Sequence, residues 1–374
     1  MKSTTWRVDG SWVGDWRMPA VLERPLSEQD RNVLVELSCG GIGPSRLVRE
    51  LELACSVGDV RKRLDPVHDP GPALTLLQRS GARTVFPCDD EYPGQLAAIH
   101  APPPMLYVRG KPLNELAPMV AIVGSRVCTR GAARFTRRLA ARLAKAGVTV
   151  VSGLARGIDA AAHEGALETG MSVAVLGTGI DRAYPSEHAA LSEWVASNGA
   201  LVGEFAPGTG PRQWHFPARN RIVSGLAIAV VVVEAGLSSG ALITAGFAID
   251  QGREVFACIT APENPSGAGV RELLRDGARL VVDPDDTTHE LLDLAKAQGY
   301  TLPGPEDAPP APRVDLAGDA ALVYGAVAEQ TTVDEVVSIT GLSASRASVV
   351  LASLELEGLV CDDGGGRWRR TQSR

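Results

Sequence analysis

The stretch Val148-Thr-Val-Val-Ser-Gly-Leu-Ala-Arg-Gly-Ile-Asp159 shows the pattern that is repeated through the centre of the chain. A short apolar run rich in valine ends in a cluster of small, polar and charged residues. Similar runs begin at Val120, Val173 and Ala227. Because these runs are almost continuously apolar rather than alternating, they are typical of strands that are buried on both faces of a parallel sheet.

The segments between these runs have the spacing of helices. From Ala132 to Ala146, Phe135, Leu139 and Leu143 fall on one stripe, and most of the charged residues fall elsewhere. Strands that alternate with helices predict a doubly wound α/β domain between about Pro118 and Asp283. Ligands of such sheets bind beyond the carboxyl ends of the strands, so we expect the polar clusters to line one crevice.

The composition limits the classes of protein to consider. A chain of 374 residues is expected to form two or three domains. Its 37 basic and 44 acidic residues give a net charge of −7, so any site for an anion must be local. Six scattered cysteines without a C-x-x-C pair favour free thiols in a reducing compartment. We find no apolar signal segment at the N-terminus and no run that could span a bilayer, so we expect a cytoplasmic protein that does not contact a membrane.

Helical patterns precede the central domain. Residues 1–26 carry no assignable pattern, and residues 27–85 predict a small helical domain of the SAM or helix-hairpin-helix type. Its Gly40-Gly-Ile-Gly43 turn could present backbone N–H groups to a phosphate, although a simple tight turn explains the glycines as well. A proline-dense connector follows, with a strand expected at Met105–Val108, and residues 86–298 are assigned to the Rossmann-like domain.

The C-terminal region reads as a second small domain. A proline-rich linker is expected at residues 299–317, followed at 318–374 by a winged-helix domain with helices near 320–328, 332–340 and 343–357 and a hairpin at 358–370. The expected recognition helix carries one charged residue, Arg346, so contact with protein is favoured over DNA reading. The basic residues Arg367, Arg369 and Arg370 keep DNA binding open as an alternative.

The first candidate site follows the strand at Val120. In Gly124-Ser-Arg126, the glycine lets a phosphate approach the backbone, the serine offers a hydroxyl and the arginine offers a charged fork. The chain has neither G-x-G-x-x-G nor G-x-x-x-x-G-K-[ST], so no nucleotide cofactor is predicted. No metal site or catalytic residue is predicted either. Asp159 is expected to cap the helix from Ala160 to Leu167.

The densest cluster is Gly210-Pro-Arg-Gln-Trp-His-Phe-Pro-Ala-Arg-Asn-Arg-Ile222. It interleaves arginines with Trp214 and Phe216. Positive charge follows a phosphate backbone, and aromatic rings give unpaired bases a face on which to stack. The alternative is that the aromatic residues belong to the core and that the arginines pair with Glu204 and Glu234.

Taken in order, these clusters resemble the DNA-processing protein A family (DprA, also called Smf). The matching stretches are Asp90–Pro93, Pro102–Gly110, Ala121–Arg126, Ser152–Asp159, His215–Ile222, Glu234-Ala235, Ser239-Gly240 with Leu242–Ala245, and Gln251–Phe256. The resemblance implies an extended Rossmann-like domain that binds single-stranded DNA and forms a homodimer. It also implies that the protein protects incoming strands in natural transformation and helps to load a RecA-type recombinase.

Carried onto this chain, the resemblance places single-stranded DNA against residues of three loops. The DNA-binding residues that it implies are Ser125, Arg126, Gly153, Arg156, Arg212, Gln213, Phe216, Arg219, Asn220 and Arg221. The chain departs from the family pattern at Gln213, where lysine is common, at Ala241, where serine is expected, and at 259–262 and 269–271.

A nucleotide-processing enzyme is the alternative function. Rossmann-like nucleoside phosphoribohydrolases use an Arg/Glu pair, for which Arg126 and Glu234 are candidates. The P-G-G-x-G-T-x-x-E loop of that class is absent from the chain, which favours DNA binding without catalysis.

Overall fold

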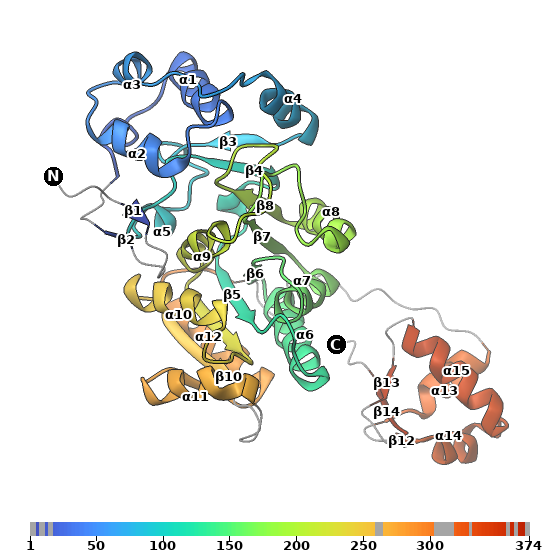
Figure 1. The fold of residues 1–374 in the computed structure, drawn as a ribbon. Helices are drawn as coiled ribbons and strands as arrows, with labels where there is room; N and C mark the ends of the chain where they lie inside the picture. Colours follow the sequence, from blue (N-terminus) through green and yellow to red (C-terminus); the bar gives the residue numbers. More distant parts are fainter. Residues whose placement is uncertain are drawn as a thin grey trace. The chain divides into compact units, whose positions relative to one another are not determined.

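The structure is a computed structural model that describes residues 5–6, 12–13, 18–258, 265–302, 318–328, 331–356, 360–362 and 366–370. Its contacts divide the chain into two compact units, residues 1–306 and 307–374 (Figure 1). Residues 303–317 of the predicted linker lie outside the described residues, as does the family departure at 259–262. Most of residues 1–17 lie outside them too, apart from the short strands β1 (Thr5–Trp6) and β2 (Trp12–Val13).

The first unit is built on a nine-stranded sheet with the order β11-β10-β9-β5-β6-β7-β8-β4-β3. From β11 to β8 every pairing is parallel, and β4 and β3 continue the sheet as an antiparallel edge. This mostly parallel, Rossmann-like sheet confirms the predicted fold class. The strands are β3 (Arg83–Val85), β4 (Leu106–Gly110), β5 (Met119–Gly124), β6 (Thr149–Ser152), β7 (Ser172–Leu176), β8 (Ala200–Gly203), β9 (Ala229–Val233), β10 (Glu254–Cys258) and β11 (Arg279–Val281).

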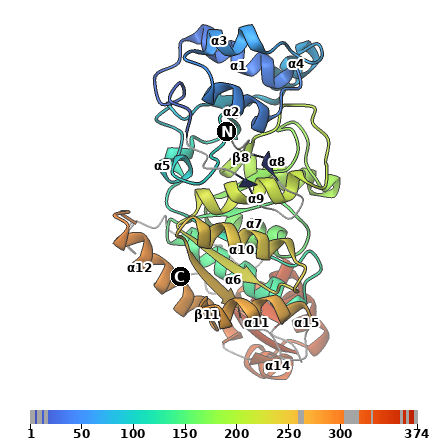
Figure 2. The same cartoon turned by 60° about the vertical axis from the view of Figure 1, so that its left-hand side comes forward.

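Helices cover both faces of the sheet, which explains why its strands are apolar on both sides. One face packs against α6 (Arg130–Lys145), α7 (Ile158–Thr169) and α12 (Pro284–Ala297), through residues such as Leu143 and Leu291. The other face packs against α5 (Gly94–Ala97), α9 (His215–Leu226), α10 (Gly240–Asp250) and α11 (Ala268–Arg275). In Figure 2, α9, α10 and α11 lie along the near side of the sheet.

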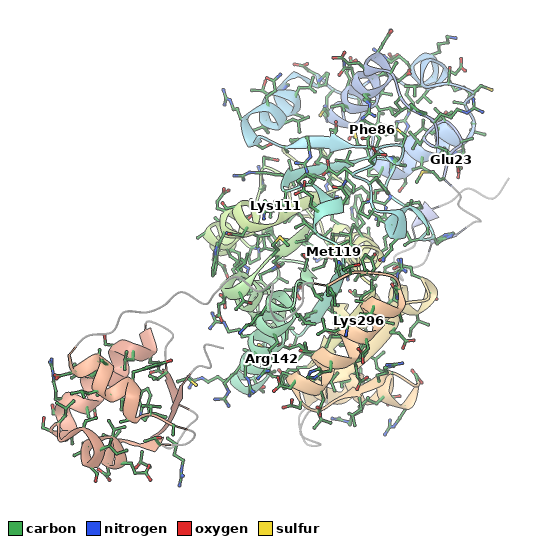
Figure 3. All side chains as sticks on the ribbon, turned by 180° about the vertical axis from the view of Figure 1, so that it is seen from behind. Glu23, Phe86, Lys111, Met119, Arg142 and Lys296 are labelled. Carbon is green, nitrogen blue, oxygen red and sulfur yellow. The ribbon has the colours of Figure 1, made fainter. Side chains whose placement is uncertain are left out.

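The N-terminal helices join this unit through a shared core. They are α1 (Glu28–Cys39), α2 (Pro44–Glu52), α3 (Val57–Arg63) and α4 (Gly71–Ser80). Phe86 and Tyr107 are fully buried among residues of these helices and of α8 (Ala189–Asn198). Figure 3 shows Phe86 where the helices meet the edge of the sheet.

The connector between the helices and the parallel strands is part of the sheet. Its predicted strand is β4, which pairs with β3 on one side and β8 on the other. The structure also places Arg83–Val85, just before the proposed boundary at residue 85, in the sheet as its edge strand β3. Hydrogen bonding across three strands could not be read from the local proline pattern.

The order of the strands determines where a ligand can enter. The chain runs from β5 outwards through β6, β7 and β8, and then returns to the opposite side of β5 as β9. The carboxyl ends of β5 and β9 therefore flank the point at which the direction of winding reverses. At such a point the following loops part and leave a crevice.

The second unit has the three-helix and wing arrangement predicted for it. Its helices are α13 (Asp319–Ala326), α14 (Val333–Thr340) and α15 (Ala344–Leu356). A small sheet with the order β12-β14-β13 completes it, formed by Thr331–Thr332, Arg367–Arg370 and Val360–Asp362. Val323, Leu351 and Leu354 form the centre of its core.

The length and composition of the helices bear on membrane insertion. Within the described ranges no single helix combines the length and the apolar character needed to cross a membrane. The bent pair formed by α14 and α15 meets these two criteria together, by length and composition alone. Val336 of α14 and Leu351 of α15 are fully buried in the core of the winged-helix unit.

Close packing of α6 on α7 makes Gly165 a sensitive position. A Cβ atom there would lie 2.3 Å from the carbonyl oxygen of Arg137 on α6. We therefore expect Gly165→Ala to lower the free energy of unfolding by about 1–3 kcal/mol. Gly246→Ala is the matched control, because Gly246 is exposed on α10 with no atom within 4 Å of the new methyl group. That variant should gain up to about 1 kcal/mol. Urea unfolding of both variants checks the prediction, which equal stabilities would contradict.

Candidate functional site

A cleft of about 750 Å³ opens at the carboxyl ends of β5, β6 and β9. Four main segments line it, at residues 123–127, 153–159, 213–223 and 236–244, together with Tyr184 and Ser266. It therefore lies at the reversal point between β5 and β9. Of the residues proposed from the sequence, those that line it are Ser125, Arg126, Gly153, Gln213, Phe216, Arg219 and Asn220.

Arg126 provides an exposed positive charge in this cleft. Its guanidinium carbon lies 5.7 Å from the centroid of the Phe216 ring, a cation–π geometry. Within the described ranges no carboxylate forms an ion pair with Arg126. The guanidinium group is therefore available to an anionic ligand. Beside it, the Ser125 hydroxyl donates to the carbonyl of Val127 at 2.7 Å and holds the loop in a tight turn.

Two aromatic rings form one wall of the cleft. The centroids of Tyr184 and Phe216 are 5.2 Å apart, with the ring planes tilted by 37°. Phe216 fits against Gly177, where a Cβ atom would lie 2.8 Å from the ring. Tyr184 is 45% exposed, so a base stacked here would find a partly open aromatic surface next to Arg126.

Arg219 forms the floor of the cleft. Its side chain is buried, and one of its guanidinium nitrogens donates to the carbonyl oxygens of Gly153, at 2.8 Å, and Val175. A Cβ atom at Gly153 would lie 2.5 Å from this guanidinium group, so glycine is needed there. Burial lowers the pKa of Arg219 to about 10, while the nearby carboxylate of Asp159 acts in the opposite direction. Arg219 therefore remains charged at neutral pH.

Asp159 supports this floor rather than the helix that follows it. Its carboxylate accepts the backbone N–H groups of Gly153 at 3.1 Å and Ala155 at 3.3 Å. The prediction that Asp159 caps a helix starting at Ala160 is wrong, because α7 starts at Ile158 with Gly157 as its N-cap. An aspartate that accepts N–H groups of the loop before it cannot be distinguished by local sequence from an aspartate that caps the helix after it.

The opposite side of the cleft is the N-terminus of α10. Ser239 caps this helix by accepting the N–H of Ala241 at 3.3 Å. The Asn220 side chain reaches across from α9 and donates to the carbonyl of Gly240 at 3.1 Å. The positive end of the helix dipole faces the cleft, which favours an anion there.

Two further predicted arginines lie at the margins. Arg156 forms a bidentate ion pair with Glu187, at 2.5 and 2.8 Å, and borders a side pocket of about 60 Å³ next to the cleft. Since both side chains are more than half exposed, this pair could open for a phosphate at little cost. Arg212 is exposed but is not among the residues that line the cleft.

Arg221 does not form a wall of the cleft, and that expectation is wrong. Its side chain is 3% exposed and pairs with Glu204, itself 4% exposed, with one contact at 3.0 Å. Its Nε also donates to the carbonyl of Ala101 at 2.8 Å. Arg221 therefore fastens α9 to the loop after β8 and to the segment that follows α5, as the alternative pairing with Glu204 anticipated.

Glu234 lies next to the cleft but does not face it. Its carboxylate is 1% exposed and accepts the backbone N–H of Thr129 at 2.7 Å, which fixes the start of α6. Glu234 and Leu154 adopt left-handed backbone conformations, with φ values of +53° and +58°. Such strain is costly for residues with side chains and often accompanies functional sites. The Arg126–Glu234 pair of the enzyme alternative is therefore not presented together to a ligand. No cluster of metal ligands is found in the described ranges.

Comparison with known proteins gives the family of the chain. The model for DNA recombination-mediator protein A matches residues 83–292, and the DprA winged helix domain matches residues 307–366. A putative DNA processing protein DprA from Mycobacterium tuberculosis is 38% identical over 336 residues, which cover 85% of this chain and 83% of that protein. The chain belongs to the DNA recombination-mediator protein A family.

Solved structures of the DprA family agree with this assignment. DNA processing protein A from Streptococcus pneumoniae aligns with a TM-score of 0.58 and 30% identity, over 72% of this chain and 95% of that one. The corresponding protein from Helicobacter pylori aligns with a TM-score of 0.52 and 29% identity, over 57% of this chain and 98% of that one. The H. pylori structure was described for its single-stranded DNA binding mode.

Some residues of the cleft were missed by reasoning from the sequence, although a signal was present. Tyr184 lies directly before a proline, in a loop that follows a strand end, which is where an aromatic side chain can be held at a site. Ser238 and Thr244 line the α10 side of the cleft. Of the departures from the DprA pattern, Gln213 and Ala241 both line the cleft. Arg271, on α11, is not among its lining residues.

The buried Arg221–Glu204 pair predicts a large effect on stability. We expect Arg221→Ala to lower the free energy of unfolding by about 3–5 kcal/mol, because it leaves the Glu204 carboxylate buried without its partner. Combining Arg221→Met with Glu204→Leu removes both charges and should restore most of the loss. Urea unfolding measures both effects. The control is Arg126→Ala at an exposed position, and equal losses in Arg221→Ala and Arg126→Ala would refute the prediction.

Two buried histidines predict a loss of stability in mild acid. Burial lowers the pKa of His163 to about 3 and that of His215 to about 4. Below the unfolded value of about 6.5, the unfolded chain binds protons that the folded chain does not, so stability falls as the pH falls. The slope should reach about 1.4 kcal/mol per pH unit for each histidine. Between about pH 6 and 5, before most carboxylates titrate, His163→Gln should have a shallower slope in urea unfolding, and an unchanged slope would contradict the assignment.

Proposed function

We propose that this chain is a recombination mediator that binds single-stranded DNA in the cleft between β5 and β9. The observation that carries the proposal is the set of groups at this one opening. They are the exposed guanidinium of Arg126, the buried guanidinium of Arg219, the Tyr184–Phe216 rings and the start of α10. A phosphate can be held by the arginine and helix terminus, while an adjacent base stacks on a ring.

The geometry favours a single strand over a duplex. The rings that would stack bases lie inside a cleft, and the bases of a duplex are already stacked on one another. The net charge of −7 disfavours long-range attraction to nucleic acid, so affinity must come from local contacts. A strand whose bases can turn into the cleft satisfies the aromatic and the cationic groups together.

We infer that the chain acts by binding and not by catalysis. The Glu234 carboxylate is committed to the backbone of Thr129. Asp181 is committed to the N–H of Gly208 at 2.7 Å, and Glu187 to Arg156. Each of these three carboxylates is therefore engaged by a neighbouring group. A polar cleft whose carboxylates are engaged in this way suits reversible binding of a phosphate backbone.

The partners are proposed on the basis of family membership. We infer a cytoplasmic protein that protects incoming strands in natural transformation, passes them to a RecA-type recombinase and forms a homodimer through the Rossmann-like domain. Dimerisation is supported by exposed apolar residues at one end of the sheet, where Leu280 and Val282 are 50% and 66% exposed on and beside the edge strand β11. The domain boundaries at residues 26, 85, 298 and 317 are likewise proposals.

Removal of the exposed cleft arginine tests the proposed function. Arg126→Ala should weaken binding of an oligothymidylate by about tenfold or more, because the variant no longer offers a charged fork to a phosphate. The dependence of log affinity on log salt should also become shallower, by about 0.7 for each phosphate that the protein no longer neutralises. Fluorescence anisotropy over a salt series gives both quantities.

The control for this test is Arg138→Ala, which removes the same charge from an exposed position on α6. Its affinity and salt dependence should match those of the parent. Equal weakening in the two variants would indicate a general charge effect, and parent-like binding by Arg126→Ala would show that the strand does not pass through this cleft.

A further inference from the structure

A second pocket is separated from the central cleft by the segment that carries Gln213, Trp214 and Phe216. It has a volume of about 260 Å³, and it lies between α2 and the start of α9. Val48, Ala101, Phe205 and Ala218 form buried apolar parts of its lining. A pocket of this size is just below the range of drug-sized ligand sites, so it suits a group no larger than one nucleobase or side chain.

Trp214 forms an aromatic wall of this pocket. The side chain is 49% exposed, although burial of an indole ring would be favourable. It is held edge-on by two neighbours, with ring centroids 5.9 Å away for Phe205 and 4.1 Å away for His215. The ring is therefore fixed in place while part of its surface stays open to a planar ligand.

Two positive charges lie on the α2 side of the same pocket. Arg46 and Arg49, both exposed on α2, line the pocket, and within the described ranges neither forms an ion pair. Helix α2 also begins here, and its N-cap residue, Gly43, has no side chain to accept a hydrogen bond from the first N–H groups of the helix. Among the carboxylates of the lining, Glu204 is paired with Arg221, while Glu52 is exposed at the far end of α2. The groups near Gly43 thus favour an anion.

The second pocket is a neighbour of the central cleft along the chain. Gln213 and Phe216 line the cleft, whereas Trp214, which lies between them in sequence, lines the second pocket. The exposed Arg212 precedes them. A ligand that leaves the cleft over this loop therefore meets a cationic side chain and then an aromatic wall.

We propose that the second pocket takes an unpaired base of the same DNA strand, stacked on Trp214, with its flanking phosphates at Arg46, Arg49 and Arg212. This inference rests on the proposed function of the central cleft and extends it to the N-terminal helices. An aromatic wall surrounded by unpaired arginines is the combination that binds single-stranded nucleic acid. An apolar peptide would satisfy the lining of the pocket but would leave these guanidinium groups without a role.

The test is a length series of oligothymidylates, measured by fluorescence anisotropy with the full chain. For the parent, affinity should rise with length until the strand spans both sites. Trp214→Ala and the double variant Arg46→Ala/Arg49→Ala should bind the shortest oligonucleotides like the parent. Their affinity for the longer oligonucleotides should be lower than that of the parent by about fivefold or more, as expected for loss of one stacked base. Trp214→Phe, which keeps an aromatic face, should recover part of this loss.

Two comparisons make the outcome decisive. Arg24→Ala/Arg79→Ala removes two exposed charges from the N-terminal part at positions outside the pocket lining, and it should follow the parent at every length. If the pocket variants also follow the parent at every length while Arg126→Ala is weakened, the second site is refuted and the cleft stands. If the parent binds no oligothymidylate, or Arg126→Ala binds like the parent, the proposed function itself has failed. The exposed arginine variants keep the test valid if Trp214→Ala does not fold.

Discussion

The buried guanidinium group of Arg219 is the interaction on which the candidate site depends. It joins three elements, because it starts from α9 and donates to carbonyls at the ends of β6 and β7. Its charge is balanced by the buried carboxylate of Asp159, which is itself held by the N–H groups of the same loop. A buried charge is tolerated when hydrogen bonds and a nearby opposite charge compensate for its loss of water, as they do here. Gly153 is required by this arrangement, since any side chain there would occupy the place of the guanidinium group.

This arrangement explains how an acidic chain can offer an anion site. Most of the arginines near the site are already used. Arg221 is neutralised by Glu204 in the interior, and Arg156 is paired with Glu187 at the surface. Arg126 differs because it is held over an aromatic ring rather than against a carboxylate. Unpaired positive charge is thus left at this opening of the sheet, where the start of α10 adds to it. Selectivity for an anionic ligand would then come from the positions of these few cationic groups rather than from the net charge of the chain.

The sequence was sufficient to predict the fold and the position of the candidate cleft, but not the contacts of each side chain. Continuous apolar runs and the loops after them identify a doubly wound sheet and its crevice, because both depend on local periodicity. Arg219 and Arg221 cannot be separated in the same way, since they are two residues apart in one motif. Arg221 meets the Glu204 carboxylate of the loop after β8, whereas Arg219 meets carbonyls at the ends of β6 and β7, and these partners are brought to α9 only by the tertiary fold. The pairing of the edge strand β3 with β4 is likewise not predictable from the sequence, because it is defined by tertiary hydrogen bonds.

His215 gives a structural reason for the spacing of the Trp214-His215-Phe216 motif. Its ring is buried, stacks on Phe205 with centroids 3.9 Å apart, and its Nδ1 lies 3.0 Å from the carbonyl oxygen of Gly177. A carbonyl oxygen only accepts, so Nδ1 carries the proton. Burial lowers the pKa of His215 to about 4 and outweighs the hydrogen bond to Gly177, which acts in the opposite direction, so the ring is neutral at pH 7. With the middle residue fixed in the core, the two residues beside it are directed to different sides of the loop. Phe216 therefore reaches the central cleft and Trp214 the second pocket. A residue inserted between Trp214 and Phe216 would turn one of the two rings away from its pocket. The spacing of the motif is therefore explained by the buried His215 ring, which fixes the directions of both neighbours.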